Sequence, residues 1–152
     1  MAETILKSSE VLKPYEAVII MHPEASLDEQ KELLRKNKGI VESFNGKFNS
    51  LDTWGKRNLA NLIGKVKKGT YFHVTFEARP AAIAELERTM RINDKVLRFM
   101  HTKLDARVSL TKFMEDFKKS LAETATRERE REAKIQAKRA AMAAMAQDRR
   151  DA

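Results

Sequence analysis

The chain contains no cysteine and only five glycines and three prolines among its 152 residues. The absence of cysteine excludes disulfides, thiol catalysis and cysteine metal sites, and it is typical of proteins from a reducing compartment. So few glycines leave no glycine-rich loop that could hold a phosphate group, and the usual nucleotide-binding and hydrolase motifs are also missing. We therefore expect neither enzymatic activity nor a cofactor.

Histidines and long apolar stretches are scarce as well. The three histidines, His22, His73 and His101, lie far apart in the sequence, and His73 and His101 have no acidic residues at the spacing of metal ligands. No metal site is therefore predicted. No apolar run approaches the roughly 18 residues that a membrane span needs, and residues 1–14 hold no apolar block of signal-peptide length. These features indicate a cytoplasmic protein.

Positive charge is in excess, with a net charge of +8 and a pI of about 9.8. An excess of this size indicates a partner of negative charge: nucleic acid, an acidic protein surface or an anionic membrane. Residues 54–74 hold five cations and no acid, and residues 88–103 hold five cations against Asp94 alone. Two interpretations that involve no partner stay open. Lys65–Lys68 can be a solvated turn, and Trp54, the only tryptophan, can pack on a sheet.

The hydrophobic pattern predicts alternating strands and helices between residues 15 and 103. They are a buried strand over 15–21, a helix from 27 to about 44, an extended segment over 47–63, a strand over 70–78, a helix beginning at Pro80 and a strand over 96–103. A capping box at Ser26 and Glu29 marks the start of the first helix, and Asn45 and Gly46 mark its end. We expect a bulge near Gly55 and a hairpin loop of six residues over 64–69.

The order β-α-β-β-α-β is that of a ferredoxin-like α+β fold, a four-stranded antiparallel sheet with two helices on one face. In the strand over 70–78, Phe72, Val74 and Phe76 alternate onto the face that the helices cover. The opposite face must then meet solvent or a partner. The predicted domains are an N-terminal arm over 1–13, the ferredoxin-like domain over 14–103 and an extension over 104–152.

The extension is basic, and we expect it to be helical or partly disordered. A short apolar stripe occupies its start: Phe113, Met114, Phe117 and Leu121. Beyond residue 123 it is rich in alanine and in charges of both signs. Glu128 with Arg131, and Glu130 with Lys134, have the spacing of helical ion pairs.

Four stretches of the sequence point to a family. They are Tyr15-Glu16, Trp54-Gly55-Lys56-Arg57-Asn58-Leu59-Ala60, Lys68-Gly69-Thr70-Tyr71-Phe72 and Arg91-Ile92-Asn93-Asp94-Lys95-Val96-Leu97-Arg98. Over about Lys13–Lys103 the chain resembles the bacterial small-subunit ribosomal protein S-six family. It departs from that family in Asn61, where an aromatic residue is common, and in the length and basic character of its extension.

The resemblance implies a non-enzymatic structural constituent of the bacterial small ribosomal subunit. Members of the family bind the central domain of small-subunit ribosomal RNA together with the eighteenth small-subunit ribosomal protein. The residues implied in RNA binding are Lys56, Arg57, Arg91, Asn93, Lys95 and Arg98. Those implied in binding the protein partner are Trp54, Arg57 and Leu59.

Two other functions are compatible with this fold. One is a free-standing single-strand RNA-binding module of the recognition-motif type, whose third-strand signature Lys68, Gly69 and Phe72 match while most of the following positions do not. The other is a small phosphate-processing enzyme, which would need the phosphate loop that the sequence lacks.

Overall fold

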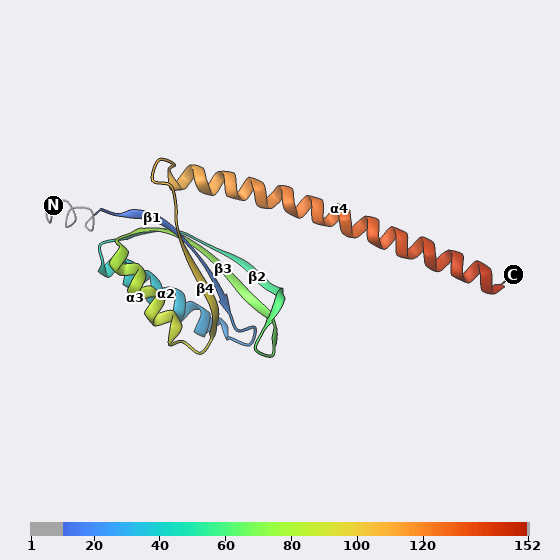
Figure 1. Cartoon of the computed structure of the whole chain (residues 1–152), viewed down its shortest axis with the longest axis horizontal. Helices are drawn as coiled ribbons and strands as arrows, with labels where there is room; N and C mark the ends of the chain where they lie inside the picture. The colour runs from blue at the N-terminus through green and yellow to red at the C-terminus, as the bar shows by residue number, and fades with distance from the viewer. Residues whose placement is uncertain (1–10, 152) are drawn as a thin grey trace. The chain divides into compact units, whose positions relative to one another are not determined.

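The computed structural model describes residues 11–151 of the chain, with side chains up to residue 143. Most of the arm predicted over 1–13 lies outside the described residues. The chain forms two compact units, one ending at Leu110 and the other beginning at Thr111. The first unit holds the sheet and two helices, and the second is a single helix (Figure 1).

The order of elements in the first unit confirms the predicted ferredoxin-like fold. The elements are β1 (Lys13–Met21), α2 (Leu27–Ser43), β2 (Lys47–Ile63), β3 (Val66–Ala78), α3 (Pro80–Arg91) and β4 (Val96–Lys103). The strands form one antiparallel sheet in the order β2-β3-β1-β4. Both helices lie on the same side of this sheet (Figure 1).

Local signals set the ends of α2 as predicted. The backbone N–H of Glu29 donates to the Ser26 hydroxyl, and the Glu29 carboxylate accepts from the Ser26 N–H at 2.7 Å. This reciprocal pair satisfies two of the amide groups that a helix start leaves free. Asn45 follows the helix with a φ of 57°, a left-handed conformation that asparagine tolerates better than most residues and that ends the helix.

The hairpin between β2 and β3 differs from the prediction. The expected six-residue loop over 64–69 is wrong, because Ile63 pairs with Val66 and only Gly64 and Lys65 form the turn. Gly64 has a φ of 60°, and a glycine at this position suits a tight two-residue hairpin. The sequence did not predict the start of β3 because both strands are solvent-exposed here. Their residues, lysines among them, show no apolar alternation. The bulge expected near Gly55 is confirmed.

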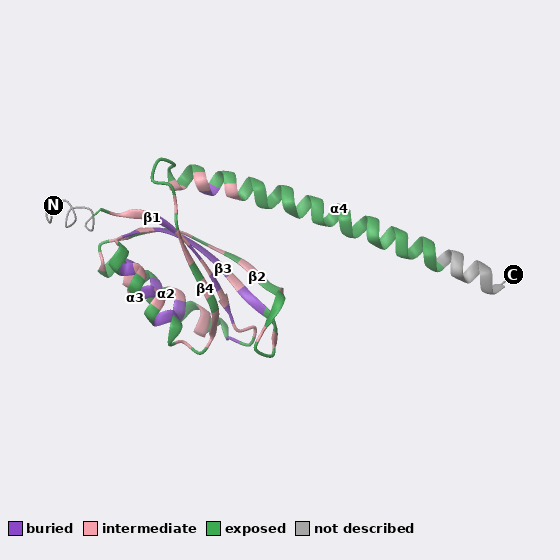
Figure 2. Ribbon diagram, in the orientation of Figure 1, coloured by how far each residue is buried: buried purple, intermediate pink, exposed green. Residues whose placement is uncertain are grey.

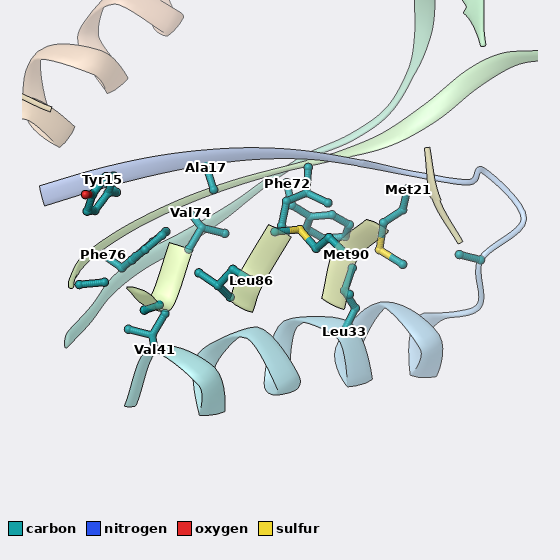
Figure 3. Packing of buried hydrophobic residues seen from close by; sticks show 14 residues of the cluster. Tyr15, Ala17, Met21, Leu33, Val41, Phe72, Val74, Phe76, Leu86 and Met90 are labelled. Atoms are coloured by element: carbon teal, nitrogen blue, oxygen red, sulfur yellow. The ribbon is translucent and has the colours of Figure 1, made fainter. Parts of the chain in front are cut away.

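The hydrophobic core lies between the sheet and the two helices. Alternate residues of the two central strands point into it, namely Tyr15, Ala17, Ile19 and Met21 of β1 and Phe72, Val74, Phe76 and Ala78 of β3. They meet Leu33 and Val41 of α2 and Leu86 and Met90 of α3 (Figure 3). The predicted face of β3 is therefore the buried one, and the purple residues of Figure 2 mark this layer.

The second unit is α4 (Leu110–Asp151), a helix of 42 residues. The rings of Phe113 and Phe117 stack with their centroids 6.0 Å apart. Met114 is buried, whereas every described side chain from Lys118 to Ala143 is exposed (Figure 2). None of the described helices has a stretch long and apolar enough to span a membrane.

Replacing Phe76 by alanine should reduce the free energy of unfolding by about 3–5 kcal/mol, the usual cost of emptying a buried phenylalanine site. Phe76 is 2% exposed and belongs to the core between the sheet and the helices. Chemical denaturation with constant m-value would measure the change. Leu62→Ala, at a side chain that is 60% exposed, is the control and should change the free energy by less than about 0.5 kcal/mol. A loss below about 1 kcal/mol for Phe76→Ala would show that the two sheet faces are assigned wrongly.

Candidate nucleic-acid and partner interface

The side of the sheet away from the helices, called here the outer face, carries the odd-numbered residues of β3. In register, Gly55 of β2, Tyr71 of β3, Ile20 of β1 and Arg98 of β4 form one row across all four strands. With strands about 4.8 Å apart, this row spans roughly 14 Å from edge to edge. It lies near the end of the sheet where β1 finishes and β4 begins, so both basic segments of the sequence reach the same end.

An aromatic cluster covers the middle of the outer face. The Trp54 ring stacks over the ring of His73 at 5.3 Å between centroids and lies 6.4 Å from that of Tyr71. His73 is fully buried, and its Nε2 is 3.1 Å from Oε2 of Glu16 on β1. Trp54 thus packs on the sheet, the plainer of the two interpretations that the sequence allowed.

A second buried polar group lies beside this cluster. The hydroxyl of Thr75 is 2.7 Å from that of Ser50 and accepts a hydrogen bond from the Asn49 side chain at 3.0 Å. Both partners come from the bulge in β2 between Phe48 and Ser50. The Thr75 hydroxyl is therefore bonded by side chains of its own sheet.

The hairpin arm, defined as residues 54–70, extends beyond the end of β1. A Cβ added at Gly69 would come within 2.5 Å of Ile20 Cγ2 and 3.5 Å of Leu59 Cδ2. The missing side chain therefore lets Ile20 and Leu59 close over β3. Leu59 and Ile20 thus lie on the outer face, which also carries Trp54.

Lys56 and Arg57 lie on the same arm and are exposed. The Arg57 Nε donates to the backbone oxygen of Trp54 at 3.2 Å, which holds the guanidinium beside the tryptophan. Among the described side chains neither cation has an acidic ion-pair partner. Their register partners, Thr70 and Gly69, lie on opposite faces of β3, so the two charges point to opposite sides of the arm.

Arg91, Asn93 and Lys95 come together at the end of α3. The Asn93 Oδ1 accepts from the Lys95 backbone N–H at 2.9 Å, which shapes the turn. Arg91 lies 3.8 Å from a carboxylate oxygen of Glu87, and Lys95 Nζ lies 3.5 Å from Oε1 of Glu29. The backbone N–H of Ser26, followed by the charge of Lys95, lowers the pKa of Glu29. Two of the three predicted RNA contacts here are thus already paired with acids.

Arg98 differs from that group. It lies on β4, at the edge of the sheet opposite β2, in register with Ile20 and therefore on the outer face. Its side chain is exposed and has no acidic partner among the described residues. Most of the predicted residues therefore form two groups at one end of the sheet, with Trp54, Arg57, Leu59 and Arg98 on the outer face and Arg91, Asn93 and Lys95 at the end of the helical layer. Lys56 belongs to neither group, because it points to the side of the arm opposite Arg57.

The sequence did not reveal the pair of Glu16 with His73. The two residues are 57 positions apart, and no local spacing connects them. The pairing of β1 with β3 supplies the signal, because it sets Glu16 opposite Thr75 and Val18 opposite His73. Once the strand register is known, Glu16 is a diagonal neighbour of His73 on the same face.

His101 is the other buried histidine and faces the core. Its ring lies 5.9 Å from that of Phe99 and 6.3 Å from that of Phe76, and its Nδ1 is 3.5 Å from Oε1 of Glu87. Burial lowers the pKa of His101 below its ordinary value of 6.5, and the nearby Glu87 carboxylate opposes that shift only in part. The imidazole is therefore held neutral in the folded domain.

His101 should make the domain sensitive to mild acid. Because the folded-state pKa is lowered, the unfolded chain binds more protons below pH 6.5, so stability is present above that pH and is lost as the pH falls toward the folded-state value. The loss cannot exceed about 1.4 kcal/mol per pH unit for one group. Urea unfolding of the wild type and His101→Leu across this range should show a flatter profile for the variant. Phe99→Leu, which removes no titratable group, should keep the wild-type slope; an unchanged slope in His101→Leu would contradict the assignment.

The fold and these surfaces define a basic ferredoxin-like domain in which neither α2 nor α3 covers the outer face of the sheet. Residues 14–103 match the model of the family described as ribosomal protein S6, and the chain belongs to that family. It is therefore a non-enzymatic protein of the small ribosomal subunit. Among the described residues there is no group of three or more His, Asp or Glu side chains that could hold a metal ion.

Two relatives and one solved structure show how far the similarity extends. The chain is 66% identical over 124 residues to the small ribosomal subunit protein bS6 of Bdellovibrio bacteriovorus, covering 82% of each chain. It is 43% identical over 89 residues to bS6 of Desulforamulus reducens, covering 59% of this chain and 94% of the relative. The crystal structure of ribosomal protein S6 from Thermotoga maritima superposes with a TM-score of 0.57 at 24% identity, covering 74% of this chain and 98% of the other, and supports the fold.

Proposed function

We propose that the ferredoxin-like domain binds the central domain of small-subunit ribosomal RNA together with the eighteenth small-subunit ribosomal protein. The observation that carries this proposal is the gathering of both basic segments and one apolar surface at the same end of the sheet. Family membership supports a role in the small subunit, and the geometry supports separate protein and RNA contacts within it.

The RNA contact would use some cations that, within the described part of the chain, are free of acidic partners and others that are already in ion pairs. Arg57 and Arg98 have no acidic partners among the described side chains and can engage phosphate at once. Arg91 and Lys95 must first leave Glu87 and Glu29. These exposed ion pairs are worth at most about 1 kcal/mol each, so the exchange costs little. Phosphate contacts of this kind supply affinity that falls steeply with salt.

The protein contact would use the apolar surface of Trp54, Leu59 and Ile20. The Trp54 ring is stacked on that of His73, so this side chain loses little freedom when a partner covers it. Leu59 and Ile20 both lie beside Gly69. Arg57 borders the surface through its bond to Trp54. A rigid aromatic anchor beside an arginine is the usual composition of an interface centre.

A recognition-motif mode of RNA binding fits the outer face less well. That mode stacks two or three bases on exposed aromatic rings of the sheet. Here Trp54 of β2 is already stacked on His73, and the outward residues of β1 are Glu16, Val18 and Ile20. β1 therefore offers no ring to a base.

Changing Arg91 and Arg98 together to glutamine should weaken RNA binding and flatten its salt dependence. Each lost phosphate contact should lower the slope of log affinity against log salt by about 0.7–0.9, so the pair should lower it by about 1.5. Titration of the transcribed central domain at several salt concentrations measures the slope. Arg35→Gln with Lys38→Gln on α2 is the matched control and should leave it unchanged. Equal slopes for wild type and the Arg91 and Arg98 variant would mark those arginines as ordinary surface charge.

Leu59→Ala should weaken association with the partner protein while leaving the RNA salt slope intact. Truncating an anchored side chain at an interface centre typically costs about 1–2 kcal/mol, and Trp54→Ala should cost at least about 2 kcal/mol. Calorimetry with the purified partner measures both. Met100→Ala, on the same face at the opposite edge and 55% exposed, is the control. Because Trp54→Ala also uncovers His73, a normal affinity in Leu59→Ala is the result that would exclude this surface.

A further inference from the structure

From Lys118 to Ala143 the α4 helix carries many charged side chains and no side chain that is buried. Every described side chain from Lys118 to Ala143 is exposed. The sequence there is dominated by alanine, glutamate, arginine and lysine, all good helix formers, so propensity alone favours the helix. The positions of the charged side chains around the axis of such a helix follow from the order of its residues.

Four cations of α4 fall on one line. The helical period of 3.6 residues places Arg127, Arg131, Lys134 and Lys138 within about 60° of one another around the axis, and a rise of 1.5 Å per residue spreads them over about 16 Å. No acidic residue between 127 and 138 falls in that sector. We call these four residues the cationic stripe.

The acids of this segment do not neutralise the stripe. Glu128 and Glu132 lie about 90–130° away around the axis, and Glu130 borders the stripe. The pairs that the spacing suggested, Glu128 with Arg131 and Glu130 with Lys134, are not formed among the described side chains. The four charges are therefore available to a polyanion.

We propose that the cationic stripe binds the phosphate backbone of RNA and is a second RNA contact, separate from that of the ferredoxin-like domain. This inference rests on the proposed function, because it takes RNA as the partner of the whole chain. Evenly spaced cations on a straight element suit a repeating line of phosphates. The stripe holds no group placed to read a base, so it would add affinity and salt dependence without sequence preference.

An acidic protein surface fits the stripe less well. Specific protein interfaces have a desolvated centre enriched in aromatic residues. From residue 118 to residue 143 the helix has no aromatic side chain, and its large apolar residues are only Leu121, Ile135 and Met142. A contact made almost entirely of cations is typical of binding to nucleic acid.

The test uses the full chain and the transcribed central domain of small-subunit ribosomal RNA. In the stripe variant all four stripe residues become glutamine, which keeps helix propensity. The salt slope should fall by about 3, so that between about 50 and about 200 mM salt the wild type loses roughly 50-fold more affinity than the variant. Circular dichroism of each chain confirms that α4 keeps its helix.

The matched control compares two pairs of arginines. Arg127→Gln with Arg131→Gln removes two charges from the stripe. Between about 50 and about 200 mM salt, this variant should lose about 7-fold less RNA affinity than the wild type. Arg129→Gln with Arg139→Gln removes two charges from other sides of α4 and should leave the slope close to that of the wild type. If the two pairs change the salt slope equally, the net charge of α4 determines RNA binding and the arrangement of cations in a stripe has no effect.

Two further outcomes separate this inference from the proposed function. If the wild-type chain binds the RNA and the stripe variant shows the wild-type slope, the stripe is refuted and the domain contact stands. If the wild-type chain fails to bind the RNA, the proposed function fails and the stripe with it. A stripe variant that associates poorly with assembled small subunits but keeps its slope on naked RNA would assign the stripe to a protein partner and overturn the proposal.

Discussion

The packing of one sheet face against α2 and α3 is the constraint on which the other features of the domain depend. Right-handed crossovers place both helices on the same side of the sheet, and Phe76, Val41 and Leu86 fill the space between the layers. The outer face then has no helix of its own unit to cover it. Two of its buried polar side chains instead have partners on the sheet itself, His73 with Glu16 and Thr75 with the bulged segment of β2.

The antiparallel order has an electrostatic consequence at one end of the sheet. The end of β1, the beginning of β4, the end of α3 and the hairpin arm all lie there. Cations from two distant segments of sequence are brought together, and like charges in proximity destabilise the free domain. Glu29 and Glu87 relieve part of that repulsion at Lys95 and Arg91. Lys56, Arg57 and Arg98 have no acidic partner among the described side chains, so their positive charge remains available to a polyanion.

Local sequence signals predicted most of the fold because each acts within a few residues. The capping box at Ser26 and the alternation through Phe72 and Phe76 gave α2 and the buried face of β3 correctly. The hairpin loop was wrong because a strand exposed on both sides shows no apolar period. The family motifs named Trp54, Leu59 and the cations, but their division into two groups depends on strand register. The pair of Arg91 with Glu87 has the i,i+4 spacing of one helix, but the pair of Lys95 with Glu29 depends on the turn after α3 meeting the start of α2, which no spacing in the sequence expresses.

The cationic stripe needs no tertiary contact, which separates it from the domain surfaces. Its geometry follows from helix period alone, so it exists wherever residues 127–138 are helical. A helix without packing has only propensity to hold it, and a partner that binds the helical form stabilises that form by mass action. Cations fixed on a helix also lose less freedom on meeting phosphate than cations on a coil. Helix formation in α4 and phosphate binding therefore reinforce each other. Rotation of the helix about its own axis would bring the acids on its other sides toward the phosphates, so the acids restrict the orientation in which the contact can form.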